Sequence, residues 1–573
     1  MTQPLEVTEY DVIVLGTGFT ESLLAGALAR TGKSVLHLDA NSHYGGGWSA
    51  LNFRDLFDWI QNTQGPVADT FGSNQESIEG RQALAINVSQ ALKQVYPTIE
   101  YEIFPLNQEK DQSALINPTE ESIQDEDQNT PSDFNALAKY LLSSDEYDHN
   151  ESIGKLISEQ FRSKLLIRTR ENEDAIAMES ARLVQLLQIH KGSNNITEDA
   201  IRHVSTCLSN LEQIETLAVL LGESKRYNLE LAPKLMPCRG ELVELLISSG
   251  VGKYLDFKAV EQTFIYLGAD EFEKVPCSKE DVFTSQTVSL VDKRKLMKFL
   301  TFALDYTNSP ETYAGYEDKS FKDFLKEKFR IEGKLLAVIL YAIALINSPG
   351  EDVYTMQGLK KTQEYLRSLG RYGNNAFLVA LYGGGSEIAQ GFCRVCAVYG
   401  GIYMLSHSTN HLLIEENSNK FIGLMDANEQ QLSSTYLVSS IDYLPSHYLE
   451  REELWEKTSR AIIIIDQPIH KDSDATITIY PPGTVNNPYS IYVIQLTHDT
   501  QTCPEDRSVL YMFTKSSEKK SPKEDLYKAF ETLANISRKP QIARLLFEKM
   551  YPGEEFLPPG PELDDEGEDF EVN

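Results

Sequence analysis

The sequence has few cysteines and no long hydrophobic segment. In 573 residues its only cysteines are Cys207, Cys238, Cys277, Cys393, Cys396 and Cys503. This sparse, scattered set is not the disulfide framework of a small secreted protein. The longest apolar run, residues 335–346, is too short for a membrane-spanning helix, which needs about 20 residues. The polar N-terminus does not resemble a signal peptide. We therefore expect a protein of the reducing cytoplasm.

Basic residues are also scarce. Lysine and arginine number 53 against 85 aspartates and glutamates, so the formal net charge is −32. Nucleic acid and anionic membrane surfaces would repel such a protein, which excludes nucleic acid as an expected partner. With 41% hydrophobic and 24% charged residues the chain is otherwise typical of globular proteins, and its length predicts two or more domains.

The sequence shows no recognisable set of catalytic residues. The ten histidines do not cluster, and no Ser/His/Asp, Cys/His or metal-ligand set emerges, so we expect neither catalytic nor metal-binding residues. Cys393 and Cys396 form a single C-x-x-C. A metal site would need a second pair and a redox site would need thioredoxin-like surroundings, so two inert core thiols are favoured. Gly32-Lys33-Ser34 resembles the end of a P-loop, but the leading glycine is replaced by Ala27.

The hydrophobic pattern predicts an α/β fold. Residues 10–15 read as a buried strand, 20–31 as a helix and 34–38 as a second buried strand, which together make one βαβ unit of a doubly wound sheet. Further strands are expected in residues 255–267, 402–405, 462–465, 476–480 and 491–496.

A helical cluster is expected between these strands. Residues 290–306 place Leu296, Leu300 and Leu304 on one face, with Phe299 and Ala303 beside them. Other helices are expected at 321–329, 335–346 and 359–369. The helix at 335–346 is apolar on every side, so it is either a core helix or one wall of an apolar cleft.

This order of elements predicts a helical domain inserted into the α/β domain. The expected boundaries are 1–282 with 380–550 for the α/β domain, 283–379 for the helical domain, and 551–573 for a disordered acidic tail. Within the first part, a polar acidic insertion is expected at about 107–150 and helical periodicity returns at 179–220.

The turn after the first strand is a broken dinucleotide-binding fingerprint. Gly16 and Gly18 stand where G-x-G-x-x-G requires them, and Asp39 stands where an acidic residue would hold a ribose. The third glycine is replaced by Glu21, whose Cβ would fill the position of close helix packing. Its carboxylate would meet a phosphate with a like charge. The chain also contains no Gly-Asp dipeptide of the kind that many flavoproteins use. We therefore expect no bound cofactor.

Three blocks carry a family resemblance. They are VIVLGTGFTES with VLHLDANSHYGG (residues 12–22 and 35–46), LAPKLMPCRGELVELLISSGVGKYLDFKAVE (residues 231–261), and LGRYGNNAFLVALYGGGSEIAQGFCRVCAVYGGIYML (residues 369–405). The chain resembles the superfamily of Rab escort proteins and Rab GDP-dissociation inhibitors. The resemblance implies a flavoprotein-like α/β fold that has lost its flavin, with a smaller helical domain.

The resemblance also implies a binding surface for GDP-bound Rab GTPases. By position it consists of six residues, which we call the platform: Tyr44, Glu387, Gln390, Arg394, Ile402 and Met404. Ile402 replaces the threonine usual in the inhibitors, so its polar contact is absent. An exposed tyrosine, arginine and methionine beside polar groups would also suit a protein-binding hot spot on physical grounds.

The escort proteins and the recycling inhibitors differ in a second surface. Residues 277–300, CSKEDVFTSQTVSLVDKRKLMKFL, resemble the escort-specific segment that docks Rab geranylgeranyl transferase, with an aromatic residue at Phe283 and an arginine at Arg294. Phe283 could equally be the staple residue of the helix that follows. The length of the chain and its polar insertion also favour the escort proteins.

The resemblance therefore implies a non-catalytic accessory subunit. It would bind GDP-bound Rab, present its C-terminal cysteines to the alpha/beta transferase, and hold the geranylgeranyl lipid until a transient membrane contact. Two alternatives stay open, namely a recycling inhibitor that ignores the transferase and, more distantly, an FAD-dependent oxidoreductase.

Overall fold

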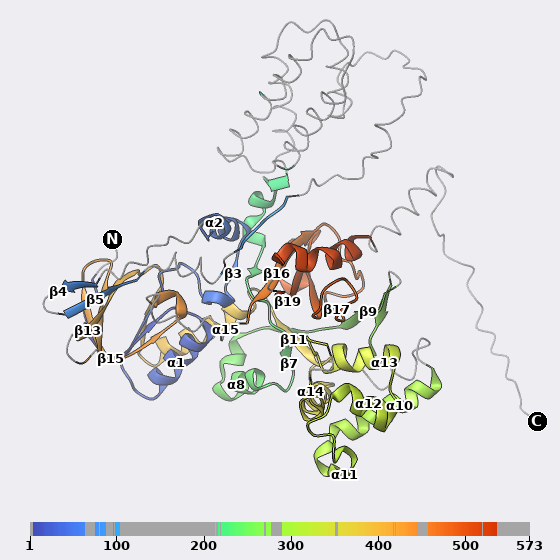
Figure 1. Ribbon diagram of the computed structural model, residues 1–573. Coiled ribbons are helices and arrows are strands. Elements are labelled where there is room, and N and C mark those ends of the chain that lie inside the picture. The colour runs from blue at the N-terminus through green and yellow to red at the C-terminus, as the bar shows by residue number, and fades with distance from the viewer. Residues whose placement is uncertain are drawn as a thin grey trace, which may run out of the picture. The chain divides into compact units, whose positions relative to one another are not determined.

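The computed structural model forms two compact units (Figure 1). Unit 1 comprises residues 1–233, 382–450 and 501–504, and unit 2 comprises residues 234–381, 451–500 and 505–573. The structure describes residues 4–63, 75–78, 81–86, 98–103, 219–268, 271–276, 289–349, 353–415, 420–444, 456–517 and 520–535, with a few single positions between them. The expected insertion at 107–150, most of the helical stretch at 179–220, Phe283 and the tail at 551–573 lie outside these residues.

Unit 1 is built on a mixed eight-stranded sheet of the described residues. In pairing order its strands are β12 (Ile402–Met404), β2 (Val35–Leu38), β1 (Glu9–Leu15), β15 (Gln431–Ser439), β14 (Lys420–Asp426), β13 (Thr409–Glu415), β5 (Arg81–Ala85) and β4 (Gln75–Ile78). The first four are mutually parallel and the remaining pairs are antiparallel. Unit 1 also contains helices α1 (Phe19–Arg30), α2 (Phe53–Thr63) and α15 (Gly385–Val398), and the short strands β3 (Ala50–Leu51) and β6 (Leu229–Glu230).

The predicted βαβ unit is confirmed. β1 and β2 are parallel neighbours joined through α1, and both are almost wholly buried, as expected for parallel strands covered on two faces. Leu15 pairs with Leu38, and Leu38 pairs with Met404 on β12. The carboxyl ends of β1, β2 and β12 therefore lie side by side at one edge of the sheet.

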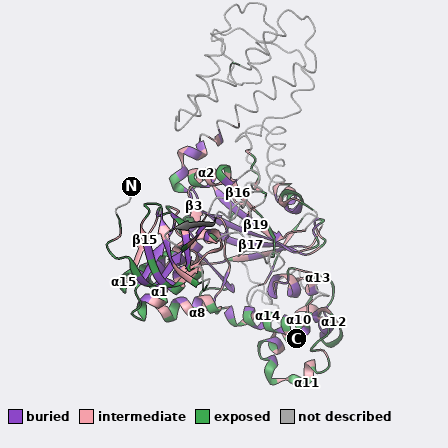
Figure 2. Cartoon of the chain, turned by 60° about the vertical axis from the view of Figure 1, so that its left-hand side comes forward, coloured by how far each residue is buried: buried purple, intermediate pink, exposed green. Residues whose placement is uncertain are grey.

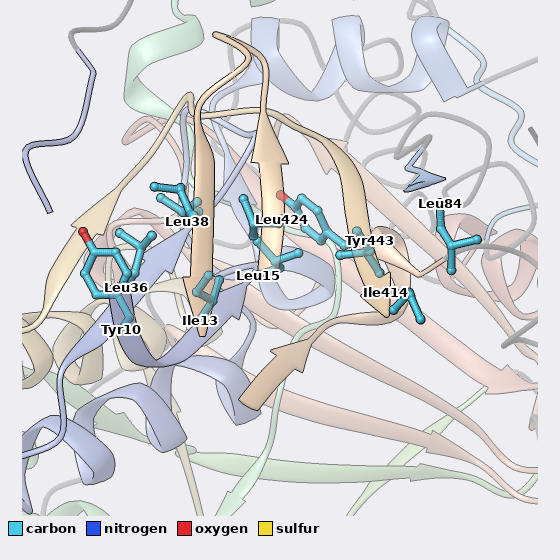
Figure 3. Close-up of a cluster of buried hydrophobic side chains, with 11 residues drawn as sticks. Tyr10, Ile13, Leu15, Leu36, Leu38, Leu84, Ile414, Leu424 and Tyr443 are labelled. Carbon is cyan, nitrogen blue, oxygen red and sulfur yellow. The ribbon is translucent and has the colours of Figure 1, made fainter. Parts of the chain in front are cut away.

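Each face of this sheet has its own hydrophobic core. One cluster gathers Ile13, Leu15, Leu36 and Leu38 with residues of the antiparallel strands and Tyr443 (Figure 3). The other joins Val12 and Val14 of β1 and Val35 of β2 to two alanines of α1, Ala25 and Ala29, and to Cys396 of α15. At Gly26 a Cβ would lie 3.0 Å from the carbonyl oxygen of Phe392, so the glycine lets α1 and α15 pack closely.

Unit 2 contains a six-stranded sheet of the described residues and a group of helices. The sheet runs β10 (Phe272–Lys274), β9 (Gln262–Tyr266), β17 (Ala475–Tyr480), β18 (Ile491–Thr497), β19 (Ser508–Lys515) and β16 (Thr458–Ile465). A smaller sheet runs β7 (Met236–Pro237), β11 (Phe377–Ala380) and β8 (Phe257–Ala259). The helices are α8 (Glu241–Ser249), α10 (Leu290–Leu304), α11 (Pro310–Tyr313), α12 (Phe321–Phe329), α13 (Gly333–Ala337) and α14 (Thr355–Ser368). Figure 2 shows buried residues mainly along the strands and exposed residues on outer helices such as α11.

Two helix predictions need comment. α10 forms where expected, but its buried face is Leu296, Phe299 and Ala303, whereas Leu304 is exposed, so the predicted stripe of Leu296, Leu300 and Leu304 is wrong in part. Residues 335–346 begin in α13 and continue as a π-helix, Val338–Ile343, whose residues are mostly buried. The core interpretation of this segment is thus confirmed for most of its residues.

The expected α/β class is confirmed, and four of the five expected strand regions contain one strand each. The fifth, 255–267, contains both β8 and β9. Helices α10 to α14 lie within residues 283–379, but unit 2 also holds strands from other parts of the chain. The boundaries of a separate helical domain stay a prediction. None of the helices in the described part of the chain combines the length and apolar character that crossing a bilayer requires.

Candidate protein-binding site

The turn between β1 and α1 keeps the backbone of a dinucleotide fingerprint. Gly16 has a φ of +91°, which favours glycine, and Gly18 is the N-cap of α1. A Cβ at Gly16 would lie 2.7 Å from the Oγ of Ser440 and 3.3 Å from the ring of Tyr443. The segment that follows β15 therefore packs directly over the turn.

Glu21 lies over the start of α1. A Cβ added at Gly18 would collide with its Oε2 atom, and the carboxylate accepts a hydrogen bond from the backbone N–H of Glu21 itself. Burial, and secondarily the charge of Asp39, raise the pKa of Glu21. The expectation that its Cβ fills the close-packing position is wrong, because that face of α1 consists of Ser22, Ala25, Gly26 and Ala29.

Asp39 follows β2 and is fully engaged within the protein. Its Oδ2 accepts hydrogen bonds from the Thr17 N–H (2.7 Å) and the Thr17 hydroxyl (2.6 Å). Its Oδ1 accepts from the N–H and the side-chain amide of Asn41 and from the Tyr443 hydroxyl (2.8 Å). A carboxylate that accepts five hydrogen bonds has little capacity left for the two hydroxyls of a ribose.

A flavin dinucleotide, the cofactor that flavoproteins of such a fold bind, does not fit these residues. Its phosphates would need the helix N-terminus where the Glu21 carboxylate lies, and its ribose would need Asp39. Asp442, in the short helix Ile441–Tyr443, adds a further carboxyl close enough for Asp39 and Glu21 to act on it electrostatically. Three acidic groups that act on one another thus lie near the turn that a dianionic pyrophosphate would approach.

This arrangement predicts a pH-dependent stability. Burial, with repulsion from Asp39 and Glu21, raises the pKa of Asp442 to about 6. Above pH 6 the Asp442 carboxylate is charged in the folded state, and its burial and repulsion lower the stability. As the pH falls from 6 towards 4, Asp442 takes up a proton in the folded state but not in the unfolded chain. The folded state therefore loses this destabilisation over that range. We expect Asp442→Asn to raise the free energy of unfolding by about 1–2 kcal/mol at pH 7.5, with no gain at pH 4.

Urea unfolding at both pH values measures this difference. The matched control is Glu9→Gln, because Glu9 is exposed on β1 of the same unit. If Asp442→Asn increased the free energy of unfolding equally at both pH values, the raised pKa of Asp442 would be contradicted.

Cys393 and Cys396 lie on the inner face of α15. Both are buried, and burial raises the pKa of the Cys393 thiol to about 12 and that of Cys396 to about 11. The Cys393 thiol donates to the Oγ of Ser22 at 3.3 Å. The prediction of inert core thiols is confirmed, because a reactive cysteine needs a lowered pKa and access. Among the described residues no group of three or more acidic, histidine or cysteine side chains could hold a metal ion.

The outer face of α15 carries three platform residues. Glu387, Gln390 and Arg394 are spaced three and four residues apart, so they follow one face of the helix. Gln390 and Arg394 are exposed and Glu387 is half-buried, whereas Ile388, Phe392 and Cys396 face the core. Burial raises the pKa of Glu387. A partly desolvated carboxylate at this position would gain from a cationic or hydrogen-bonding partner.

Tyr44 lies in the loop after β2, beside the start of α15. At Gly45 a Cβ would approach the Cα of Ser386 to 3.1 Å, which places the Tyr44 loop against the residue that precedes Glu387. The rings of Tyr44 and Tyr403 are 6.1 Å apart, and burial together with a hydrogen bond to Tyr403 raises the pKa of Tyr44. Tyr403 is thus a contact of the platform that the sequence did not reveal.

Ile402 and Met404 flank Tyr403 on the edge strand β12. Both are partly buried against the cluster of Ile13, Leu15 and Leu38. Since alternate residues of a strand point to opposite faces, Tyr403 turns towards Tyr44 while Ile402 and Met404 turn towards that cluster. The structure thus places all six platform residues in unit 1, and it adds Tyr403, whose ring contacts that of Tyr44. The role of the six in binding stays a prediction.

A glycine-rich turn fixes the N-terminus of α15. Gly384 has a φ of +51°, and a Cβ there would collide with the carboxylate of Glu230. That buried carboxylate accepts a weak hydrogen bond from the N–H of Gly385 at 3.4 Å. Glycine is required at position 384 because the acidic group approaches the backbone of the first turn, and a Cβ at Gly385 would lie 3.0 Å from the side chain of Trp48.

The second predicted surface involves α10 in unit 2. Ser289 caps the helix by accepting a hydrogen bond from the Asp292 N–H at 3.1 Å. Arg294 is exposed and forms no ion pair with the described residues, and Leu290 and Val291 on the preceding turn are 75% and 62% exposed. Phe283 lies outside the described residues, so its role stays a prediction.

Comparisons with known proteins show the family of this chain. The model of the family described as "GDP dissociation inhibitor" matches residues 6–78 and 180–553. The mouse protein "Rab proteins geranylgeranyltransferase component A 2" is 34% identical, over 91% of this chain and 83% of its own length. Human "component A 1" is 31% identical, over 92% of this chain and 80% of its own length.

A solved structure of a similar protein has the same fold. The crystal structure of a Rab GDI from Plasmodium falciparum has a TM-score of 0.54 and 18% identity, and the match covers 92% of this chain and 87% of that one. This chain therefore belongs to the GDP dissociation inhibitor family, together with the component A proteins of Rab geranylgeranyltransferase.

Proposed function

We propose that this protein is a Rab escort protein. It binds GDP-bound Rab GTPases through the platform, presents them to the alpha/beta heterodimer of Rab geranylgeranyl transferase, and carries the prenylated product to membranes. Its role is that of a non-catalytic accessory subunit, working in the cytoplasm and transiently at membranes.

The observation that carries the binding role is the outer face of α15. Glu387 is partly desolvated at its start, Gln390 and Arg394 continue the same face, and Tyr44 lies against its first turn. An aromatic residue and an arginine beside a partly buried carboxylate have the composition of protein-binding hot spots. The face opposite is packed into the core, so α15 is a rigid support.

The names of the similar proteins favour an escort role over a recycling role. Two proteins named as component A of Rab geranylgeranyltransferase share 34% and 31% of their residues with this chain. The exposed Leu290, Val291 and Arg294 on α10 offer a second surface at the segment for which transferase docking is predicted.

A carrier is also physically necessary for such a product. Each methylene group moved from water into an apolar environment contributes about 0.8 kcal/mol, so a free geranylgeranyl chain in water costs on the order of 10 kcal/mol. The net charge of −32 keeps the protein itself from anionic bilayers until a specific partner brings it there.

A prenylation assay tests this proposal. Purified transferase, a GDP-loaded Rab and labelled geranylgeranyl diphosphate are mixed with and without this protein. We expect lipid transfer to the Rab only when the protein is present. Equal transfer in its absence would refute the escort role, whereas extraction of prenylated Rab from membranes without any stimulation of transfer would identify a recycling inhibitor.

A further inference from the structure

The collapsed dinucleotide turn shares its hydrogen bonds with the loop that carries Tyr44. Thr17 and Asp39 are each 1% exposed, and Tyr443 is 2% exposed, so the group is sealed from water. Hydrogen bonds in such a place are strong and their loss is costly, because no water can replace a missing partner.

The Tyr44 loop is fixed at both ends by this group. At its start, Asn41 donates to Asp39 through its backbone N–H at 2.8 Å and its side-chain amide at 3.0 Å. At its end, the Gly45 N–H donates to the carbonyl oxygen of Thr17 at 3.0 Å and to its hydroxyl at 3.1 Å. Tyr44 lies between these two attachments.

The same group holds the end of β12. The Asp39 N–H donates to the carbonyl oxygen of Met404 at 2.9 Å, and the His407 N–H donates to the carbonyl oxygen of Asp39 at 2.9 Å. Tyr443 completes the group, since its hydroxyl donates to Asp39 and accepts from the Ala40 N–H at 2.7 Å.

We infer that Thr17, Asp39 and Tyr443 are positioning residues of the Rab-binding surface: the former cofactor turn holds the Tyr44 loop and β12 in the binding geometry. This inference rests on the proposed function. The acid that would hold a ribose in a nucleotide-binding relative here organises a protein-binding loop, which explains why the turn keeps its glycines while its ligand position is filled.

Substitutions of Asp39 and Thr17 separate this role from general stability. Asp39→Asn preserves shape but leaves one oxygen for five donors, so at least two donors face the new amide group. Thr17→Val removes the hydroxyl that bridges Asp39 and Gly45, and Thr17→Ser restores it. We expect Asp39→Asn and Thr17→Val each to weaken binding of GDP-bound Rab about tenfold, and Thr17→Ser to bind within twofold of wild type.

A double-mutant cycle tests whether Asp39 acts on Rab binding through Tyr44. With Tyr44→Ala in the background, the effect of Asp39→Asn should fall well below tenfold, because only the part that acts through β12 is left. With Arg394→Ala in the background, the tenfold effect should persist. Tyr443→Phe, which removes the hydroxyl that donates to Asp39, should also weaken binding, and Tyr436→Phe is its control, since Tyr436 is 66% exposed on β15 of the same unit.

Each outcome is decisive. An Asp39→Asn effect of equal size with and without Tyr44 would show a general structural role and overturn the inference, as would wild-type binding by Thr17→Val. If Asp39→Asn does not fold, the Thr17→Val and Thr17→Ser pair still decides. Wild-type binding by Tyr44→Ala would instead remove Tyr44 from the platform, and the inference would then lose the residue that it says is positioned.

Discussion

Replacing Tyr44 by alanine is expected to weaken binding of GDP-bound Rab by about 2–4 kcal/mol, the range of central interface residues. The ring is half-buried, packs against Tyr403 and reaches the start of α15 through its loop. Its truncation removes an aromatic anchor and leaves the Tyr403 hydroxyl without this partner. Calorimetric titration with a GDP-loaded Rab measures the loss.

The matched control is Tyr436→Ala. Tyr436 is 66% exposed on β15, in unit 1, and belongs to none of the predicted surfaces. It should leave binding within twofold. Unchanged affinity of the Tyr44 variant, with an unfolding transition like that of wild type, would remove Tyr44 from the platform.

The same calorimetric titration also tests the role of Arg394. It is exposed two turns along α15 from Glu387, so we expect Arg394→Ala to cost at least 1 kcal/mol of binding, less than the loss of the half-buried tyrosine. An effect below the error of the titration would exclude Arg394 from the contact.

The parts of this fold that the sequence predicts are those with local signals. The β1–α1–β2 unit follows from two continuous apolar runs around a helix and a glycine turn, and each signal lies within a few residues of the element that it specifies. Tyr403 and Tyr443 were missed because their roles depend on pairings distant in sequence. The Tyr443 hydroxyl meets Asp39 across 404 positions of the chain, which no local pattern encodes.

The error on α10 has a geometric cause. A step of four residues turns a helix by about 400°, so the residues 296, 300 and 304 drift by about 40° at each step. The combination of Leu296, Phe299 and Ala303 uses steps of three and four and stays closer to one line. Leu304 is the last residue of the helix and turns outwards.

Side chains of this protein occupy the position that a dinucleotide would need, and this changes which function the fold can serve. Asp39 keeps the location that nucleotide chemistry would use, but its five hydrogen bonds now connect the turn, the Tyr44 loop and Tyr443. A cofactor would have to break these bonds and expel Glu21 before it could enter. The closed turn is therefore better suited to supporting a constant surface than to binding an exchangeable small molecule.

Replacing Arg294 by glutamate is expected to reduce prenylation of a Rab at least tenfold while leaving binding of GDP-bound Rab unchanged. Arg294 is exposed on α10, and the neighbouring Leu290 and Val291 are the kind of apolar surface that a partner would cover. Reversing the charge within such a contact costs several kcal/mol, because the partner's groups then face a like charge. Since Arg294 forms no ion pair among the described residues, the folded protein itself should lose little stability.

Two measurements make this prediction specific. Lipid incorporation is assayed at increasing transferase concentration, so that a weakened contact appears as a shift of the titration midpoint and not as a lower plateau. Lys361→Glu, an equal charge reversal at an exposed position of α14, is the control. Phe283→Ala should reproduce the defect if the aromatic residue plugs the transferase, and should instead lower stability without shifting the midpoint if it staples α10. A normal midpoint for Arg294→Glu would mean that this helix does not dock the transferase, and the recycling alternative would then be favoured.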